Sequence, residues 1–106
     1  MANDGVISFE NFRIDLQRGE LRQNERVVQV EPQVLDLITY LAKHPGAIVS
    51  RDDLIEHVWG GRIVSDSAIS TRINAARAAL GDDGQAQKLI KTLPRRGFRF
   101  EGAVRG

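Results

Sequence analysis

The hydrophobic positions of this chain follow a strand-like pattern first and a helical pattern afterwards. Over the first thirty residues, short apolar or alternating runs are separated by polar turns, which predicts an antiparallel meander of three or four strands. The runs occupy residues 6–9, 12–16, 19–22 and 27–30. The alternation of Phe12, Ile14 and Leu16 predicts that one face of this sheet packs on a core.

From residue 32 onward the apolar residues recur every three or four positions, which predicts helices. The first helix begins at Pro32, a residue that the first helical turn tolerates, and the Pro-Gly pair at 45–46 ends it. Ser50 can cap a second helix, and Asp53 three residues later can complete a capping box. The Gly-Gly pair at 60–61 ends this second helix.

A third helix and a hairpin complete the predicted elements. Asp66 can cap a helix that runs to Leu80 and is closed by Gly81. After a polar turn, two further strands flank the segment Pro94-Arg95-Arg96-Gly97. This pattern predicts a β-hairpin over residues 88–101 with a basic tip.

The predicted third helix has two chemically different faces. At about 100° per residue, one narrow apolar stripe must be buried, and it consists of Ile69, Ile73, Ala76 and Leu80. The opposite side is small and polar, with no carboxylate after Asp66. It comprises Ser67, Thr71, Asn74, Ala75 and Ala78, with Ser70 and Arg77 at one edge and Arg72 at the other. Short polar side chains with arginines at the rims suit a helix that enters a DNA groove.

Charge is divided unevenly between the two halves of the chain. Residues 1–59 contain six Lys/Arg and ten Asp/Glu, whereas residues 60–106 contain nine Lys/Arg and four Asp/Glu. Twelve of the fifteen basic residues are arginine, which suits bidentate contacts to phosphate and guanine. A polyanion is therefore expected to meet the second half, although a solvated surface with segregated charge would have the same composition.

The remaining composition excludes several classes of protein. A chain of 106 residues with 42% apolar residues is one globular domain, and no apolar stretch approaches the roughly 20 residues that span a bilayer. The absence of cysteine excludes a disulfide framework and a thiolate zinc site, and it fits a cytoplasmic location. His44 and His57 have no third ligand in an evident pattern, and no catalytic motif is present. We therefore expect no metal, no cofactor and no enzymatic activity.

The order of strands, three helices and hairpin resembles the winged helix-turn-helix effector domain of the OmpR/PhoB type. The matching segments are residues 32–38, 49–54, 58–60, 69–73, 79–82 and 92–100. The resemblance implies an α+β fold with an N-terminal antiparallel sheet, three helices and a C-terminal hairpin wing. It implies a domain over residues 1–102, with 103–106 as the start of a linker or tail. The family binds promoter DNA, and a domain placed first in the chain resembles one-component bacterial regulators.

The resemblance also implies roles for particular residues. The third helix (66–80) would read the major groove of double-stranded DNA, and the wing (88–101) would lie over the minor groove. Arg72, Asn74 and Arg77 fall on helix positions that touch DNA in relatives, and Arg96 falls on a wing-tip contact. Relatives often have arginine at the position of Ala75, so one direct base contact is missing here.

Two further segments match functional positions of the family. Trp59 is expected in the core with its indole N–H near the surface, on a position that can touch a phosphate. The loop over 60–65 matches a segment that some relatives use to contact RNA polymerase.

The expected DNA-binding site comprises residues of the third helix and the wing, together with Trp59. The candidate DNA-binding residues are Trp59, Ser67, Ser70, Thr71, Arg72, Asn74, Arg77, Arg95, Arg96 and Arg99. The free domain is expected to be a monomer, because no large apolar patch or heptad seam is evident, and two copies are expected head-to-tail on DNA. The alternative is a winged-helix module for protein–protein contact without DNA binding, using the apolar Ile63-Val64 segment or the sheet.

Overall fold

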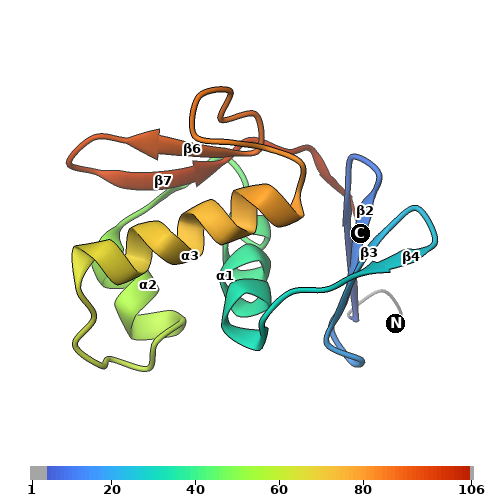
Figure 1. Cartoon of the computed structure of the whole chain (residues 1–106), viewed down its shortest axis with the longest axis horizontal. Helices are drawn as coiled ribbons and strands as arrows, with labels where there is room; N and C mark the ends of the chain where they lie inside the picture. The colour runs from blue at the N-terminus through green and yellow to red at the C-terminus, as the bar shows by residue number, and fades with distance from the viewer. Residues whose placement is uncertain (1–4, 106) are drawn as a thin grey trace.

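The computed structural model describes residues 5–105 as two antiparallel sheets with three helices between them (Figure 1). The N-terminal sheet lies at one end of the molecule, and the hairpin of β6 and β7 lies at the other, above the long helix α3. The helices are α1 (Pro32–Ala42), α2 (Arg51–His57) and α3 (Asp66–Ala79). The predicted α+β winged-helix architecture is confirmed.

The N-terminal meander forms four consecutive antiparallel strands. They are β1 (Val6–Phe9), β2 (Phe12–Asp15), β3 (Glu20–Gln23) and β4 (Arg26–Val28), and their ends differ from the predicted runs by up to two residues. Phe9, Ile14 and Leu21 point inward and are fully buried. The strand alternation therefore places one face of this sheet on the core, as the sequence predicts.

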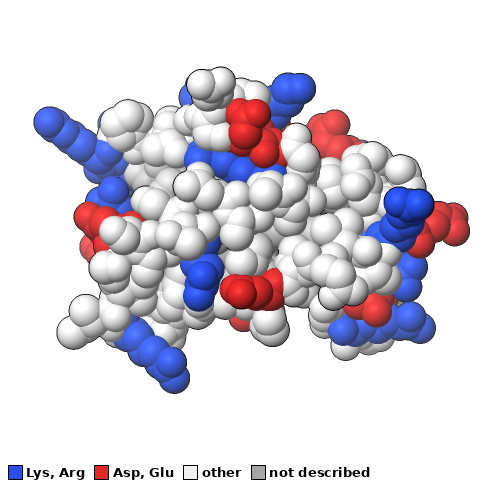
Figure 2. Space-filling view, viewed as in Figure 1, with Lys and Arg blue, Asp and Glu red and all other residues white. Residues whose placement is uncertain are grey.

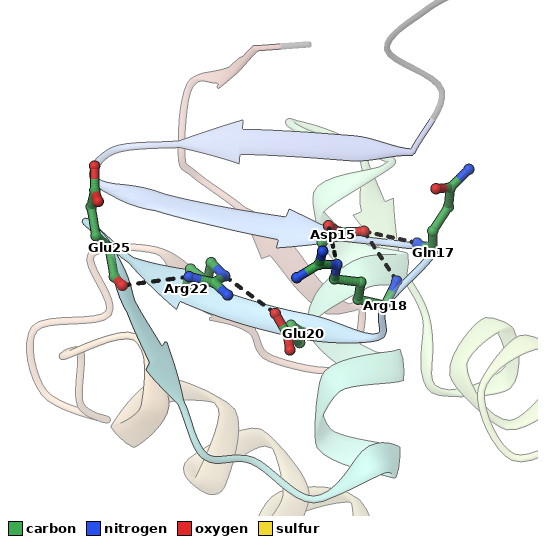
Figure 3. A network of polar contacts seen from close by, with 6 residues as sticks. All are labelled: Asp15, Gln17, Arg18, Glu20, Arg22 and Glu25. Atoms are coloured by element: carbon green, nitrogen blue, oxygen red, sulfur yellow. Dashed lines mark hydrogen bonds and ion pairs between the residues drawn. The ribbon is translucent and has the colours of Figure 1, made fainter.

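The opposite face of this sheet pairs its charged groups locally (Figure 3). Arg22 donates from Nε to Glu20 Oε1 at 3.2 Å and from a terminal nitrogen to the Glu25 carbonyl at 3.4 Å. Asp15 accepts the backbone N–H groups of Gln17 and Arg18 at 3.1 and 3.0 Å. With Arg18 Nε also 4.0 Å from Asp15 Oδ2, two arginines of the first half of the chain have local carboxylate partners at the end of the molecule away from the hairpin.

The predicted capping of α2 is confirmed. Ser50 Oγ accepts the backbone N–H of Asp53 at 3.0 Å, and the Asp53 carboxylate accepts the backbone N–H of Ser50 at 3.1 Å. These two bonds satisfy backbone donors at the start of the helix, and the bond from the Ser50 backbone lowers the pKa of Asp53. The helix ends at His57, so Trp59 lies just beyond it, before the two glycines.

The start of α3 differs from the prediction by one residue. Ser65, rather than Asp66, is the N-cap, and Ser65 Oγ accepts the backbone N–H of Ala68 at 3.1 Å. Asp66 is the first helical residue, where its negative charge is favourable near the positive end of the helix dipole. At the other end, Leu80 is the C-cap and Gly81 adopts a φ of 70°, as expected for a closing glycine.

The wing is a three-stranded sheet rather than an isolated hairpin. The strands β6 (Ile90–Leu93) and β7 (Gly97–Phe100) form the predicted hairpin, and the short link β5 (Ile48–Val49) pairs with β7. Gly97 has a φ of 133°, and a Cβ at this position would collide with the carbonyl oxygen of Val49. The glycine is therefore required by the close approach of β5, in addition to the tight turn that the sequence predicts.

A short strand lies beyond the predicted domain boundary at residue 102. The strand β8 (Val104–Arg105) pairs with β1, and a terminal nitrogen of Arg105 donates to the Glu10 carbonyl at 2.9 Å. Val104 and Arg105, which the sequence placed in a linker or tail, thus add a fifth strand to the N-terminal sheet. Such a pairing between the two ends of the chain leaves no local signal in the sequence.

Candidate nucleic-acid interface

Helix α3 presents its polar face to solvent, as the sequence predicts. Its apolar stripe is buried against the core, and it consists of Ile69, Ile73, Ala76 and Leu80. On the other side, the exposed residues are Ser67, Ser70, Thr71, Asn74 and Ala78. The exposed face therefore offers hydroxyl and amide groups on short side chains, which can approach base edges closely.

Arg77 is not part of this exposed face, although the sequence placed it at the edge of the face as a candidate DNA contact. The residue is only 5% exposed, and its guanidinium donates to the Ile90 carbonyl at 3.0 Å and to Thr92 Oγ1 at 2.7 Å. Burial lowers the pKa of Arg77, while the carboxylates of Asp82 and Asp83 act in the opposite direction. In helical projection Arg77 lies about 70° from the centre of the apolar stripe, so it flanks the core where β6 packs.

Arg72 lies on the other flank of α3 and is half-buried. Its Nε donates to Gln33 Oε1 at 3.3 Å, and a terminal nitrogen lies 3.8 Å from Glu31 Oε1. Both partners belong to the start of α1, so Arg72 joins the two helices. Its side chain nevertheless remains 37% exposed, which leaves it accessible to an anion at the rim of the polar face.

The tip of the wing is basic and exposed. Arg95 and Arg96 are both exposed, Arg95 has a φ of 68°, and the backbone N–H of Arg96 donates to the Leu93 carbonyl at 2.9 Å. Arg99, further along β7, is half-buried and its Nε lies 2.6 Å from Glu101 Oε2. Among residues 5–105, the two tip arginines have no carboxylate partner, and neither do the exposed Lys88 and Lys91, whereas Arg99 is paired with Glu101.

The wing tip and the N-terminal end of α3 lie at the same end of the molecule (Figure 1). A hollow between them is lined by residues of α2, the start of α3 and the hairpin, among them Arg51, Asp66, Arg95 and Arg96. Arg51 Nε lies 3.6 Å from Asp66 Oδ1, so an exposed ion pair joins the starts of α2 and α3. Figure 2 shows a mostly uncharged surface over α3, with Lys and Arg atoms projecting at the hairpin end.

The segment between α2 and α3 contains the remaining candidates. Trp59 is 8% exposed and belongs to the core, as predicted for the bulk of its ring. Gly60 and Gly61 both have positive φ, and Ile63 beyond them is fully exposed while Val64 packs against the core. An isolated, fully exposed isoleucine on a loop is available for contact with another macromolecule.

Sequence reasoning missed the residue that fixes the loop between α3 and the wing. The Asp82 carboxylate accepts four backbone N–H groups, from Asp83, Lys88, Leu89 and Ile90, at 2.8 to 3.3 Å. Burial by itself raises the pKa of Asp82, but these donors outweigh it and the pKa lies below its ordinary value. The Asp-Asp-Gly sequence indicates a turn, but it does not reveal that the first carboxylate spans the whole loop.

Other types of site are not found in the described part of the chain. Residues 5–105 contain no group of three or more His, Cys, Asp or Glu side chains that could hold a metal ion. None of their helices is long and apolar enough to cross a bilayer. His44 and His57 instead flank the ring of Tyr40, with ring centroids 4.5 and 5.2 Å from it.

Comparison with known proteins gives a family match over most of the chain. Residues 24–100 match the family described as "Transcriptional regulatory protein, C terminal". The transcriptional activator CadC of Escherichia coli is 35% identical over 82 residues, which are 76% of this chain and 16% of CadC. The phosphate regulon regulator PhoB of Escherichia coli is 28% identical over 101 residues, which are 94% of this chain and 44% of PhoB. The chain thus spans less than half the length of these relatives.

Solved structures show the same fold. The DNA-binding domain of Escherichia coli CadC superimposes with a TM-score of 0.82 at 28% identity, covering 98% of each chain. The Klebsiella pneumoniae RstA DNA-binding domain, in a crystal structure with the RstA box, superimposes with a TM-score of 0.80 at 26% identity, covering 91% of this chain and 96% of RstA.

Proposed function

Because the chain belongs to the family of transcriptional regulatory protein C-terminal domains, the OmpR/PhoB-type DNA-binding domains, we propose that it binds specific double-stranded DNA as the DNA-binding part of a bacterial transcription regulator. One observation supports this proposal most directly. The polar face of α3, free of carboxylates after Asp66, lies beside a hairpin tip with two exposed arginines. The family is one of DNA-binding regulators rather than of enzymes.

In this proposal the exposed face of α3 enters the major groove. Asn74 can pair with N6 and N7 of adenine, and the methyl group of Thr71 can pack on a thymine methyl. Ser67 and Ser70 contact base edges or phosphates on the same face. Arg72 contacts the sugar-phosphate wall on the side of α1.

The wing approaches the neighbouring minor groove through its tip. Arg95 and Arg96 are exposed there, and arginine is suited to a narrow groove between two phosphate chains. Arg99 reaches a phosphate only if it leaves Glu101. The indole N–H of Trp59 contacts a further phosphate.

The loop over 60–65 is proposed as a contact for RNA polymerase. Its Ile63 is fully exposed and its Arg62 is exposed, and both belong to the loop before α3 rather than to the helix itself. The sequence shows no heptad seam, so the free domain is proposed to be a monomer that binds direct repeats as two head-to-tail copies. Half-sites would then lie about one helical turn apart.

Selection of bound sequences from a random duplex pool tests the proposed function. A specific DNA-binding domain enriches one motif, and binding to that motif survives competition by random duplex. Failure to enrich any sequence, together with no mobility shift of random duplex at low salt, contradicts DNA binding. That result would favour the protein–protein module, which Ile63 supports as an exposed apolar contact.

A further inference from the structure

The free edge of β6 is covered by side chains rather than by another strand. In the wing sheet the strand order is β5-β7-β6, so among residues 5–105 one edge of β6 has no strand partner. Asp82 Oδ2 accepts the backbone N–H of Ile90 at 3.3 Å, and Gln87 Oε1 accepts that of Thr92 at 2.9 Å. The Arg77 guanidinium donates a hydrogen bond to the Ile90 carbonyl on the same edge. Both backbone groups of Ile90 and the N–H of Thr92, which would otherwise meet solvent at this edge, are therefore hydrogen-bonded to side chains.

Arg77 is the only one of these three side chains that comes from α3. Its two bonds reach Ile90 and Thr92, which are two residues apart on β6, so the guanidinium fixes the strand at two points. Thr92 pairs with Phe98 on β7 and lies two residues before the wing tip at Pro94. A rigid planar fork that grips a strand at two points sets its direction as well as its distance.

The loop after α3 reinforces this connection. The backbone N–H of Asp82 donates to the Arg77 carbonyl at 2.8 Å. The Asp82 carboxylate accepts the backbone N–H groups of Lys88 and Leu89, at the start of the wing. Asp82 thus hydrogen-bonds both ends of the loop over residues 83–88, and it lies next to the last turn of α3, which contains Arg77. The end of α3 and the beginning of β6 form one hydrogen-bonded unit.

We propose that Arg77 is a positioning residue that sets the orientation of the wing relative to α3, and that it determines through the wing tip how tightly the domain grips the minor groove. The proposal rests on the proposed DNA-binding function and extends it. A residue that touches no DNA would then control one half of the binding site. Arg77 acts on Arg95 and Arg96 and not on the readers of α3.

The test is a set of double-mutant cycles measured as dissociation constants for the selected duplex. Arg77→Lys keeps the positive charge but cannot make both bonds in the same geometry, and we expect about a fivefold weaker Kd, as for the loss of one hydrogen bond. In the Arg95→Ala/Arg96→Ala background the same change should have less than about a twofold effect. In the matched Asn74→Ala background it should keep its full effect, because Asn74 lies on the other half of the site.

A positional readout separates orientation from general stability. Minor-groove protection by the wing, measured by hydroxyl-radical footprinting, should weaken in Arg77→Lys, whereas protection of guanine N7 in the major groove should persist. All measurements are made at a temperature at which circular dichroism shows each variant to be folded. Thr92→Val removes the second acceptor of Arg77 at almost equal side-chain volume, and it should also weaken the minor-groove protection. If Arg77→Lys does not fold, Thr92→Val is the variant that tests the proposal.

Several outcomes would overturn the proposal. Equal effects of Arg77→Lys in both backgrounds would mean that Arg77 acts on the whole domain or on DNA directly. No effect on the parent protein would mean that the wing is oriented by its core contacts alone. If the parent protein itself enriches no sequence, the proposed function fails, which is a different result from additivity in a protein that binds.

Discussion

At the scale of single residues, Asn74 separates sequence readout from simple attraction to DNA. It is exposed on the polar face of α3, opposite the buried stripe. Asn74→Ala should therefore lose about 1–3 kcal/mol of binding free energy on the selected site and little on random duplex. Mobility-shift titrations on both duplexes measure this difference.

The control for Asn74 is a residue on the buried side of the same helix. Ile73→Ala should cost about 2–5 kcal/mol of folding stability, whereas Asn74→Ala should leave the unfolding transition almost unchanged. Equal weakening of both duplexes by Asn74→Ala would show that this side chain does not read a base.

Glu31 is predicted to restrain Arg72. Its carboxylate lies 3.8 Å from the guanidinium, and this pair must loosen before Arg72 can turn toward a phosphate. Glu31→Gln should raise affinity for DNA by up to about fivefold at low salt, with the gain shrinking as salt screens the charges. Folding stability should change by less than about 1 kcal/mol, because the pair is solvent-accessible.

Fluorescence anisotropy at two salt concentrations measures this effect. The matched control is Glu25→Gln in the N-terminal sheet, where a carboxylate is removed at the other end of the molecule. The idea is wrong if both variants gain affinity equally, because the gain would then reflect net charge alone.

At the scale of elements, Asp82 decides whether the loop after α3 holds its shape. Replacing this carboxylate by an amide removes a charged acceptor that four backbone N–H groups share. Asp82→Asn should cost about 2–4 kcal/mol of unfolding free energy at neutral pH. Asp83→Asn is the control, since the Asp83 carboxylate accepts two N–H groups, from Gln85 and Ala86, in an exposed turn, and it should cost less.

The pH dependence of this difference follows from the lowered pKa of Asp82. A carboxyl with a folded pKa below its unfolded value of about 3.9 stabilises the fold above that pH, and the contribution is lost as the pH falls through the folded pKa. Denaturant unfolding from pH 7 to pH 3 should therefore show the parent protein approaching Asp82→Asn at the acidic end. A constant gap over this range would contradict the assignment.

At the scale of the whole molecule, the number of accessible arginines sets the salt dependence of binding. With Arg77 buried, the candidates for phosphate contact are Arg72, Arg95, Arg96 and Arg99. Three or four such contacts give a slope of log K against log salt near −3 to −4. Arg96→Ala should flatten this slope by about one, whereas Arg18→Ala in the N-terminal sheet should not. A slope near zero for the parent protein would show that these arginines do not contact DNA phosphates.

Much of the architecture could be predicted because its causes are local. The strand alternation, the Ser50–Asp53 capping box, the closing glycine at 81 and the helical stripe of α3 are set by neighbours within a few residues. These features are stabilised by turn geometry, by capping and by burial of one face, and each of these depends on residue types that can be read from the sequence pattern. The polar face of α3 and the basic wing tip follow from the same periodicities.

The tertiary structure decided what depends on distant segments. The pairing of β8 with β1 joins the two ends of the chain, and the collision that requires Gly97 comes from Val49. Arg77 is the clearest case, because a flanking position on a helix can face solvent or a neighbour. Strand β6 approaches this flank with a carbonyl and a hydroxyl that accept hydrogen bonds from the guanidinium, so the flank is buried and Arg77 joins α3 to the wing.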